Sequence, residues 1–167
     1  MSCKKSIAVS ACLLGHKVRY DGQHQANLIV VQDLSVLFNI IPVCPEMEIG
    51  LGVPREKIEL HQQGDDIRLL STTQPVVDLT ARMLAYAQRF VERHLFAGLV
   101  LKDKSPSCGV GNCKIWDKHG HMQHHADGIF AATIMRLKPG LPMLQSNELG
   151  VESALQSFVQ RVNAYAS

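Results

Sequence analysis

Three cysteines of this chain lie in turn-forming contexts close to short apolar runs. Cys12 follows the run at residues 6–11, Cys44 precedes a proline, and Cys108 lies in a Ser-Pro-Ser-Cys-Gly segment after the run at residues 99–101. In an α/β fold the carboxyl ends of parallel strands share one edge, where such folds place their chemistry. Three thiols that converge at this edge can hold a metal ion or a cluster and leave one coordination position open.

The other cysteines leave the ligand set open. Cys113 forms a C-x4-C pair with Cys108 and is either a fourth ligand or an incidental loop thiol, and we favour the loop thiol. Cys3 lies in an N-terminal segment that we expect to be frayed. Each cysteine can also be purely structural, because free cysteines are among the most buried residues. The spacing of the three cysteines matches no zinc-finger or ferredoxin pattern, so the predicted site depends on the predicted fold.

A carboxylate and two hydroxyls lie close in sequence to these thiols. Glu46 follows the second cysteine after one proline, where a carboxylate beside a metal centre is well placed to move protons, and Glu48 is a rival for that role. Ser105 and Ser107 flank the proline before the third cysteine, and either hydroxyl can hold a water molecule or bind a substrate heteroatom. The alternatives are a solvated loop charge or a carboxylate at a helix N-terminus for Glu46, and ordinary turn chemistry for the serines.

Two further segments are candidates for substrate binding. Arg55 follows a proline that presents it rigidly, and its guanidinium can hold a carbonyl or phosphate oxygen, although a surface arginine is the commoner outcome. Tyr20 and Asp21 form either a plain turn or a loop that covers the same edge of the sheet. The histidine-rich segment 119–125 lacks metal-ligand geometry and is expected to be a solvated loop. The glycine-rich segments match neither a dinucleotide fingerprint nor a P-loop.

The elements that must position these residues alternate between strands and helices. Apolar runs predict strands at residues 6–11, 40–44, 57–61, 67–71, 99–101 and 141–144, with a hairpin turn after the third. Helical periodicity predicts helices at residues 28–38, 78–96, 128–137 and 151–165. Loops are expected at residues 13–25, 46–55 and 102–127, the last with a short strand at 114–117. This order predicts a compact, Rossmann-like three-layer α/β domain with a mainly parallel sheet and the site at the carboxyl edge of its strands.

Length and composition are typical of a globular chain. The 167 residues predict a single domain, residues 1–167, with an apolar fraction of 46% and a charged fraction of 19%. The net charge of +2 comes without a run of lysine and arginine, which argues against nucleic-acid binding. No apolar stretch approaches the roughly 20 residues that span a bilayer, and the N-terminus lacks the apolar region of a signal peptide. We therefore expect a cytoplasmic protein with reduced cysteines.

Several segments of the chain, in order, resemble the motifs of a known family, the thiouracil desulfidases. They are Val-Ser-Ala-Cys-Leu-Leu-Gly at 9–15, Arg-Tyr-Asp-Gly at 19–22, Val-Cys-Pro-Glu at 43–46, Gly-Leu-Gly-Val-Pro-Arg at 50–55, Lys-Ser-Pro-Ser-Cys-Gly at 104–109 and Asp-Gly-Ile-Phe-Ala-Ala at 127–132. The resemblance covers most of residues 6–145, and its specificity comes from the number and order of the motifs.

The resemblance implies a compact α/β fold that binds a [4Fe-4S] cluster through three cysteines. These cysteines correspond to Cys12, Cys44 and Cys108, and the fourth iron has no protein ligand and takes up the sulfur of a thiolated pyrimidine. The family's catalytic carboxylate corresponds to Glu46 and its catalytic serine to Ser105. A fourth protein ligand would remove the open iron, and with it this mechanism.

The function that we expect is removal of sulfur from a thiolated pyrimidine by non-redox hydrolysis, which yields the oxo-pyrimidine and sulfide. The substrate is a small molecule, as base, nucleoside or nucleotide, and the residues expected to bind it are Arg55, Ser107, Tyr20 and Asp21. We expect a monomer or homodimer that binds neither nucleic acid nor membrane. Two alternatives remain: a non-catalytic metal or cluster protein that senses or carries, and a plain α/β domain with structural cysteines.

Overall fold

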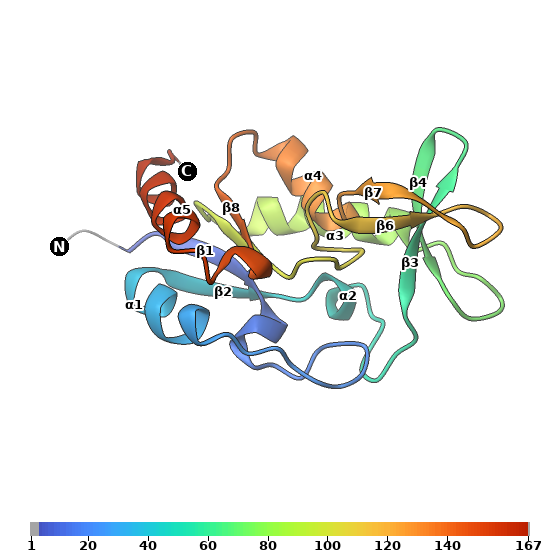
Figure 1. The fold of residues 1–167 in the computed structure, drawn as a ribbon, viewed down its shortest axis with the longest axis horizontal. Helices are drawn as coiled ribbons and strands as arrows, with labels where there is room; N and C mark the ends of the chain where they lie inside the picture. Colours follow the sequence, from blue (N-terminus) through green and yellow to red (C-terminus); the bar gives the residue numbers. More distant parts are fainter. Residues whose placement is uncertain (1–3, 167) are drawn as a thin grey trace.

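The first sheet is built from four parallel strands that lie far apart in the sequence. The protein is described here by a computed structural model over residues 4–166, so Cys3 lies outside the described residues. The strands are β1 (Ser6–Ser10), β2 (Asn39–Val43), β5 (Leu99–Leu101) and β8 (Met143–Gln145), in the order β2-β1-β5-β8 (Figure 1). All three pairs are parallel, as predicted.

Helices cover both faces of this sheet because its strands alternate their apolar side chains between the faces. Ile7 and Val9 of β1 pack with η2 (Ile29–Leu34) and α5 (Glu152–Ala164), and the short α1 (Ser35–Leu37) continues η2. Ala8 faces the opposite way, into a core that it shares with α3 (Thr80–Arg93) and α4 (Ile129–Leu137). The predicted three-layer α/β architecture is confirmed.

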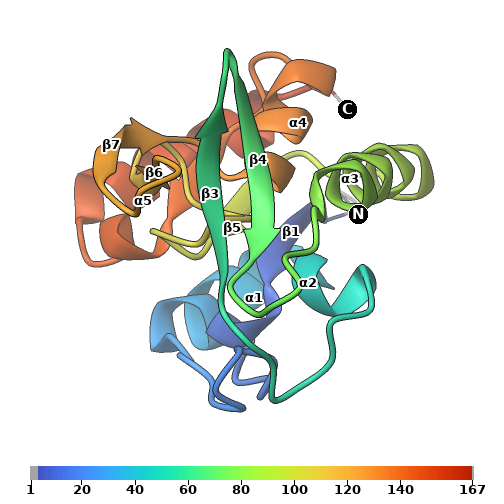
Figure 2. The same ribbon diagram turned by 90° about the vertical axis from the view of Figure 1, so that its right-hand side faces the viewer.

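A second sheet lies at one end of the first, at the right of Figure 1 and facing the viewer in Figure 2. It contains β3 (Ile58–Gln63), β4 (Asp66–Ser71), β6 (Cys113–Trp116) and β7 (Met122–Ala126), in the order β4-β3-β6-β7. Only β3 and β6 are parallel. Leu60, Leu69 and Ile115 of this sheet are fully buried in the same core as α3 and α4.

The differences from the predicted elements concern short or exposed segments. Strand β7 lies within the predicted loop 102–127, because four of its five residues are exposed and its sequence carries no alternation. The short helices η1 (Ala11–Leu14), α2 (Pro45–Glu48) and η3 (Ser146–Glu148) were not predicted as helices. Among residues 4–166, no helix combines the length and apolar composition that crossing a membrane requires.

The chain connections of the first sheet determine where a site can form. After β1 the chain crosses through η2 on one face, whereas after β5 it crosses through α4 on the other. Neighbouring strands whose connections leave in opposite directions create a crevice beyond their carboxyl ends. The segments that follow β1 and β5 in this crevice are those that carry the first and third predicted cysteine ligands.

Candidate functional site

A cavity of about 330 Å³ opens beyond the carboxyl ends of β1, β2 and β5. Seven of the nine residues predicted for the site line it: Cys12, Cys44, Cys108, Glu46, Ser105, Arg55 and Tyr20. The other two do not. Asp21 is exposed in the adjacent turn, and Ser107 is buried behind the wall.

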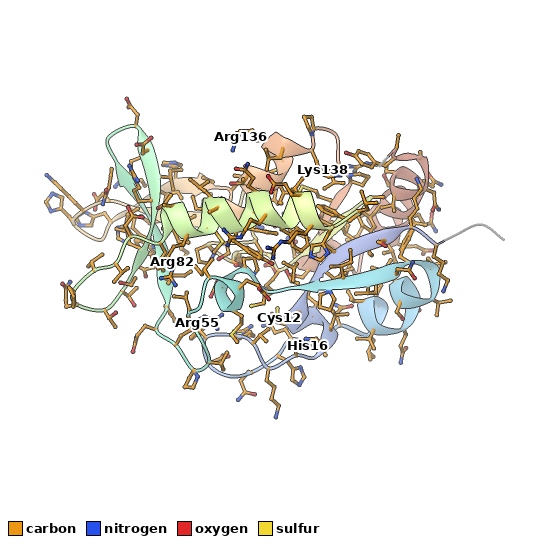
Figure 3. The ribbon with its side chains drawn as sticks, turned by 180° about the vertical axis from the view of Figure 1, so that it is seen from behind. Cys12, His16, Arg55, Arg82, Arg136 and Lys138 are labelled. Carbon is orange, nitrogen blue, oxygen red and sulfur yellow. The ribbon has the colours of Figure 1, made fainter. Side chains whose placement is uncertain are left out.

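The first two cysteines are held by the turns that end their strands. Cys12 lies in η1, which Gly15 ends at a φ of 93°, a backbone conformation that favours glycine. The carbonyl of Cys12 accepts the amides of Gly15 and Gln25, so that the turn closes on the cysteine. Cys44 ends β2 directly before α2 and donates its thiol to the carbonyl of Val18, at 3.8 Å. Figure 3 shows Cys12 and Arg55 along the same edge of the molecule, beneath α2.

The third cysteine is presented by a turn built around Ser105. The Ser105 hydroxyl oxygen accepts the backbone amides of Ser107 at 3.2 Å and Cys108 at 3.1 Å. The Ser105 carbonyl accepts the amide of Gly109 at 2.8 Å. These bonds fix the orientation of Cys108, which is almost completely buried.

The start of α4 packs directly on this turn. Two of its first backbone amides donate to carbonyl groups of the turn: that of Ile129 to the carbonyl of Pro106, and that of Ala131 to the carbonyl of Ser107. Gly128 approaches so closely that a Cβ atom there would lie 2.5 Å from the carbonyl of Ser107. The close approach explains why a glycine precedes the helix, in the motif at 127–132.

Burial and mutual proximity oppose ionisation of the three thiols. Burial raises the pKa of Cys12 to about 11, with a further contribution from the neighbouring Cys44. Burial raises the pKa of Cys44, and burial followed by the charge of Glu46 raises that of Cys108. Thiolates bind metal, so a positively charged group must enter the cavity as the thiol protons leave. The cavity is therefore suited to hold a cationic metal centre.

The donor set fits a cluster of several metal ions. Among residues 4–166, no three histidine, cysteine or acidic side chains lie close enough together to hold a single ion. In an iron–sulfur cluster each cysteine binds a different iron, so thiols spread around one cavity are appropriate ligands. Arg19 also lines this cavity, and its Nε is buried without a hydrogen-bond partner. The residues present therefore fit an iron–sulfur cluster.

Cys113 does not join this group. It begins β6, is 1% exposed, and donates its thiol to the carbonyl of Ser105, at 2.9 Å. Burial, with a smaller effect of Asp127, raises the pKa of Cys113 to about 12. It lines a neighbouring cavity and not the one that the other three cysteines share. Cys113 thus supports the Ser105 turn from behind.

Glu46 is held at both carboxylate oxygens. Its Oε2 accepts Nε of Arg55 at 3.0 Å and Nη2 at 2.8 Å. Its Oε1 accepts the hydroxyl of Ser107 at 3.0 Å. Glu46 therefore enters the cavity as an oriented, charge-paired carboxylate, on a short helix that starts immediately after Cys44.

The guanidinium of Arg55 is fully engaged by protein atoms. Besides Glu46, it donates to the carbonyl of Gly52 at 2.8 Å and to that of Val18 at 2.9 Å. Its side chain is only 6% exposed. Arg55 and Ser107 thus hold Glu46 in position, and their predicted contact with a substrate stays a prediction.

The cavity also contains charged residues that were not singled out from the sequence. Lys102, Asp103 and Lys104 lie between β5 and the Ser105 turn, and Arg19 precedes Tyr20 in the 19–22 motif. Lys102 is paired with Asp103, with an N–O distance of 2.6 Å. The position of these residues, next to predicted site residues in the chain, was the signal that could have identified them.

A second cavity, of about 560 Å³, adjoins the first. The two share Tyr20, Glu46, Lys104 and Pro106 as walls. The second cavity also contains aromatic and basic side chains from the second sheet and its approach: Lys57, Lys114, Trp116 and His125. These residues therefore lie next to the cavity that contains the three cysteines.

Comparisons with known proteins agree with this geometry. A solved structure of the [4Fe-4S]-dependent thiouracil desulfidase TudS is similar, with a TM-score of 0.65 and 28% sequence identity over 92% of this chain and 99% of that one. An uncharacterised protein of Bacillus subtilis (strain 168), YbbK, is 34% identical over 118 residues, which are 63% of this chain and 74% of the relative. The family model for 2-thiouracil desulfurase matches residues 7–146. The chain therefore belongs to the 2-thiouracil desulfurase family.

Proposed function

We propose that this protein is an iron–sulfur-dependent desulfidase that removes sulfur from a thiolated pyrimidine. The observation that carries this proposal is the shared cavity, in which three thiols from separate strand ends surround a space beside an oriented carboxylate. Family membership supports the same activity. The alternative of a sensor or carrier does not explain why both oxygens of Glu46 are held in position.

Cys12, Cys44 and Cys108 are the ligands that would hold a [4Fe-4S] cluster, and Cys113 is not among them. Three ligands for four irons leave one iron without a protein ligand. When bound, such a cluster supplies a Lewis-acidic iron with affinity for soft sulfur, which polarises the C=S bond of the substrate.

Glu46 is the proton acceptor in this proposal. The carbon of the C=S group is attacked by water, and the water must lose a proton as the C–O bond forms. Arg55 donates twice to Oε2 and Ser107 once to Oε1, which fixes the plane of the Glu46 carboxylate and leaves one lone pair, on Oε1, for the water. The proton taken by Glu46 is then available for the departing sulfur.

Ser105 acts as a hydrogen-bond donor. Its oxygen already accepts two backbone amides, so the free direction of the hydroxyl is its hydrogen. Two donors on the oxygen also polarise the O–H bond and strengthen the bond that it donates. The Ser105 hydroxyl can therefore orient the attacking water or stabilise the leaving sulfur.

The reaction balances without a redox partner. Water replaces sulfur at one ring carbon: its oxygen becomes the carbonyl oxygen, and both of its hydrogens leave with the sulfur, while the ring gains none. The products are the oxo-pyrimidine and hydrogen sulfide, with no net electron transfer. The protein groups needed are one that accepts a proton and one that donates a hydrogen bond, which Glu46 and Ser105 provide.

The test is anaerobic turnover by cluster-loaded protein. 2-Thiouracil, 4-thiouracil and 4-thiouridine monophosphate are supplied separately, and sulfide and the oxo-pyrimidine are measured. Equal amounts of the two products from at least one substrate are expected. An intact cluster without turnover of any of the three would contradict the proposal and favour a carrier or sensor. A preference for the monophosphate would place its ribose and phosphate in the second cavity, near Lys57 and Lys114.

A further inference from the structure

Arg19 is a cavity residue that the proposed mechanism leaves without a role. The backbone next to it is firmly held, because the Val18 carbonyl accepts both the Cys44 thiol and Nη2 of Arg55. The Arg19 carbonyl accepts the amide of Gly22 at 2.9 Å, which closes the turn. Arg19 therefore projects from a backbone fixed to a cluster ligand on one side and to the arginine that holds Glu46 on the other.

The guanidinium of Arg19 has donors to spare. Within residues 4–166 its Nε is the buried side-chain nitrogen or oxygen that lacks a hydrogen-bond partner. Its protein contacts are long, with Asp21 oxygens 3.4 Å from both Nε and Nη2. A buried donor without a partner costs free energy, and a charged one costs more. No partner is found for Nη1 of Arg19 among the described residues, and Nη1 is not among the buried unpartnered atoms, so Arg19 keeps a donor for a ligand in the cavity that it lines.

The other cations of the cavity are either engaged or exposed. Arg55 has all three nitrogens bonded to protein atoms, and Lys102 is bonded to Asp103. Lys104 is exposed at the rim. Arg19 is thus the partly buried cation of this cavity, with its side chain 24% exposed, that remains able to recognise a ligand.

We propose that Arg19 determines substrate specificity by donating hydrogen bonds to the carbonyl oxygen that a thiouracil-type pyrimidine retains. This inference rests on the proposed function. A thiouracil ring carries sulfur and oxygen on two carbons that are separated by one ring nitrogen. With the sulfur directed at the three cysteines, the oxygen, whose bond diverges from the C=S bond, meets another part of the cavity wall, which Arg19 helps to line. The Arg19 guanidinium offers that oxygen its Nη donors, and it lies over the ring of Tyr20, with Cζ of Arg19 5.8 Å from the ring centroid.

The test compares substrates with and without the retained oxygen. Cluster-loaded wild type, Arg19→Met and Lys17→Met are assayed with 2-thiouracil and with pyrimidine-2-thione, which lacks the second oxygen. Lys17 is the matched control, since it lies in the same segment, is exposed and does not line the cavity. Arg19→Met is expected to lose about 10- to 100-fold in kcat/KM for 2-thiouracil, mostly through KM, and little for pyrimidine-2-thione.

Binding of the product gives a readout independent of turnover. Uracil carries the recognised oxygen but no sulfur, so its calorimetric affinity for the cluster-loaded protein reports Arg19 directly. Arg19→Met should weaken uracil binding by a factor similar to the loss in kcat/KM, Arg19→Lys should recover part of it, and Lys17→Met should leave it unchanged.

Other outcomes overturn the inference. Equal losses for the two substrates in Arg19→Met would mean that Arg19 acts on the cluster or on the fold. Unchanged kinetics would mean that it contacts no substrate. If wild type turns over none of the thiopyrimidines, the proposed function itself fails, which is distinguishable because this failure occurs before any variant is compared.

Discussion

Each group that we propose to take part in the reaction is held in position by its neighbours. Glu46 is positioned by Arg55 and Ser107, and Ser105 is positioned by the backbone amides that its oxygen accepts. Such preorganisation lowers the cost of reaching the transition state, because the groups do not reorient as charge develops. It also means that loss of one partner affects the reaction without removing the reacting group.

Replacing Glu46 with glutamine tests the proton acceptor alone. Glutamine keeps the shape: its amide oxygen can still accept the Arg55 guanidinium and its amide nitrogen can donate to the Ser107 hydroxyl oxygen, but it cannot take up a proton. We expect Glu46→Gln to keep its cluster absorbance and to lose about 10²- to 10⁴-fold in kcat, the usual contribution of a general base. Activity within a few-fold of wild type would show that another group accepts the proton.

Of the four cysteines within residues 4–166, three are the proposed ligands, and Cys113 supports the Ser105 turn. Serine variants of Cys12, Cys44 and Cys108 should each fail to retain about four irons per chain after anaerobic reconstitution. Cys113→Ser should retain them, since serine can still donate to the Ser105 carbonyl. Iron and sulfide content measure the outcome. Loss of iron in Cys113→Ser, with its fold intact by circular dichroism, would make Cys113 a fourth ligand.

The raised pKa of Cys113 makes a prediction about stability at alkaline pH. The pKa rises from an ordinary 9.0 to about 12, so between these values the folded state keeps a proton that the unfolded state has lost. Stability therefore falls as pH rises through this window. Serine does not titrate there, so the free energy of unfolding in urea should fall less for Cys113→Ser than for wild type between about pH 8 and about pH 10. Equal pH slopes would contradict the buried, protonated thiol.

At the scale of elements, the site depends on where strands end and where α4 begins. The strand ends were predictable because β1, β2 and β5 are short apolar runs followed by turn residues. The contacts between the first residues of α4 and the Ser105 turn were not predictable. Nothing local in a sequence indicates which distant backbone a glycine will approach. Strand β7 was missed for a related reason: it is stabilised by pairing with β6 and not by buried side chains of its own.

Alanine at Gly128 tests this contact between elements. A Cβ atom there would lie 2.5 Å from the backbone of Ser107, so either the turn or α4 must move. We expect Gly128→Ala to destabilise the protein by about 1–3 kcal/mol and to lower cluster retention. Gly150→Ala is the control, since no atom lies within 4 Å of the added Cβ. Equal cluster retention in the two variants would show that the α4 start does not position the Cys108 turn.

At the scale of the molecule, the residues that we propose to take part in the reaction follow strands of the first sheet. The second sheet and its approach contribute side chains to the adjoining second cavity. The cysteines follow strands of the first sheet, whereas Lys57, Lys114 and Trp116 of the second cavity come from the second sheet and its approach. The sequence predicted the β3–β4 hairpin and the strand that became β6. It did not predict their union into one sheet, because parallel pairing of β3 with β6 is a long-range contact without a local pattern.

The shared core predicts that both sheets unfold together, as a single domain. Trp116 is the only tryptophan of the chain and reports the second sheet by fluorescence, whereas far-ultraviolet circular dichroism reports mainly the helices around the first. Urea unfolding followed by the two probes should give one coincident transition. Leu60→Ala, in the second sheet, should lower the free energy of unfolding measured by either probe by about 2–5 kcal/mol. The reason is that Leu60 is fully buried in the core that contains α3 and α4.

Leu144→Ala provides the converse change, because Leu144 is buried on the opposite face of the first sheet, against α5. In a single cooperative domain this substitution also lowers the urea concentration at which the Trp116 fluorescence reports unfolding. It does so although Leu144 and Trp116 belong to different sheets. If Leu60→Ala moves only the fluorescence transition and Leu144→Ala only the circular dichroism, the sheets are separate folding units. The second cavity would then lie between units that open independently, and access to the cysteines would depend on their relative motion.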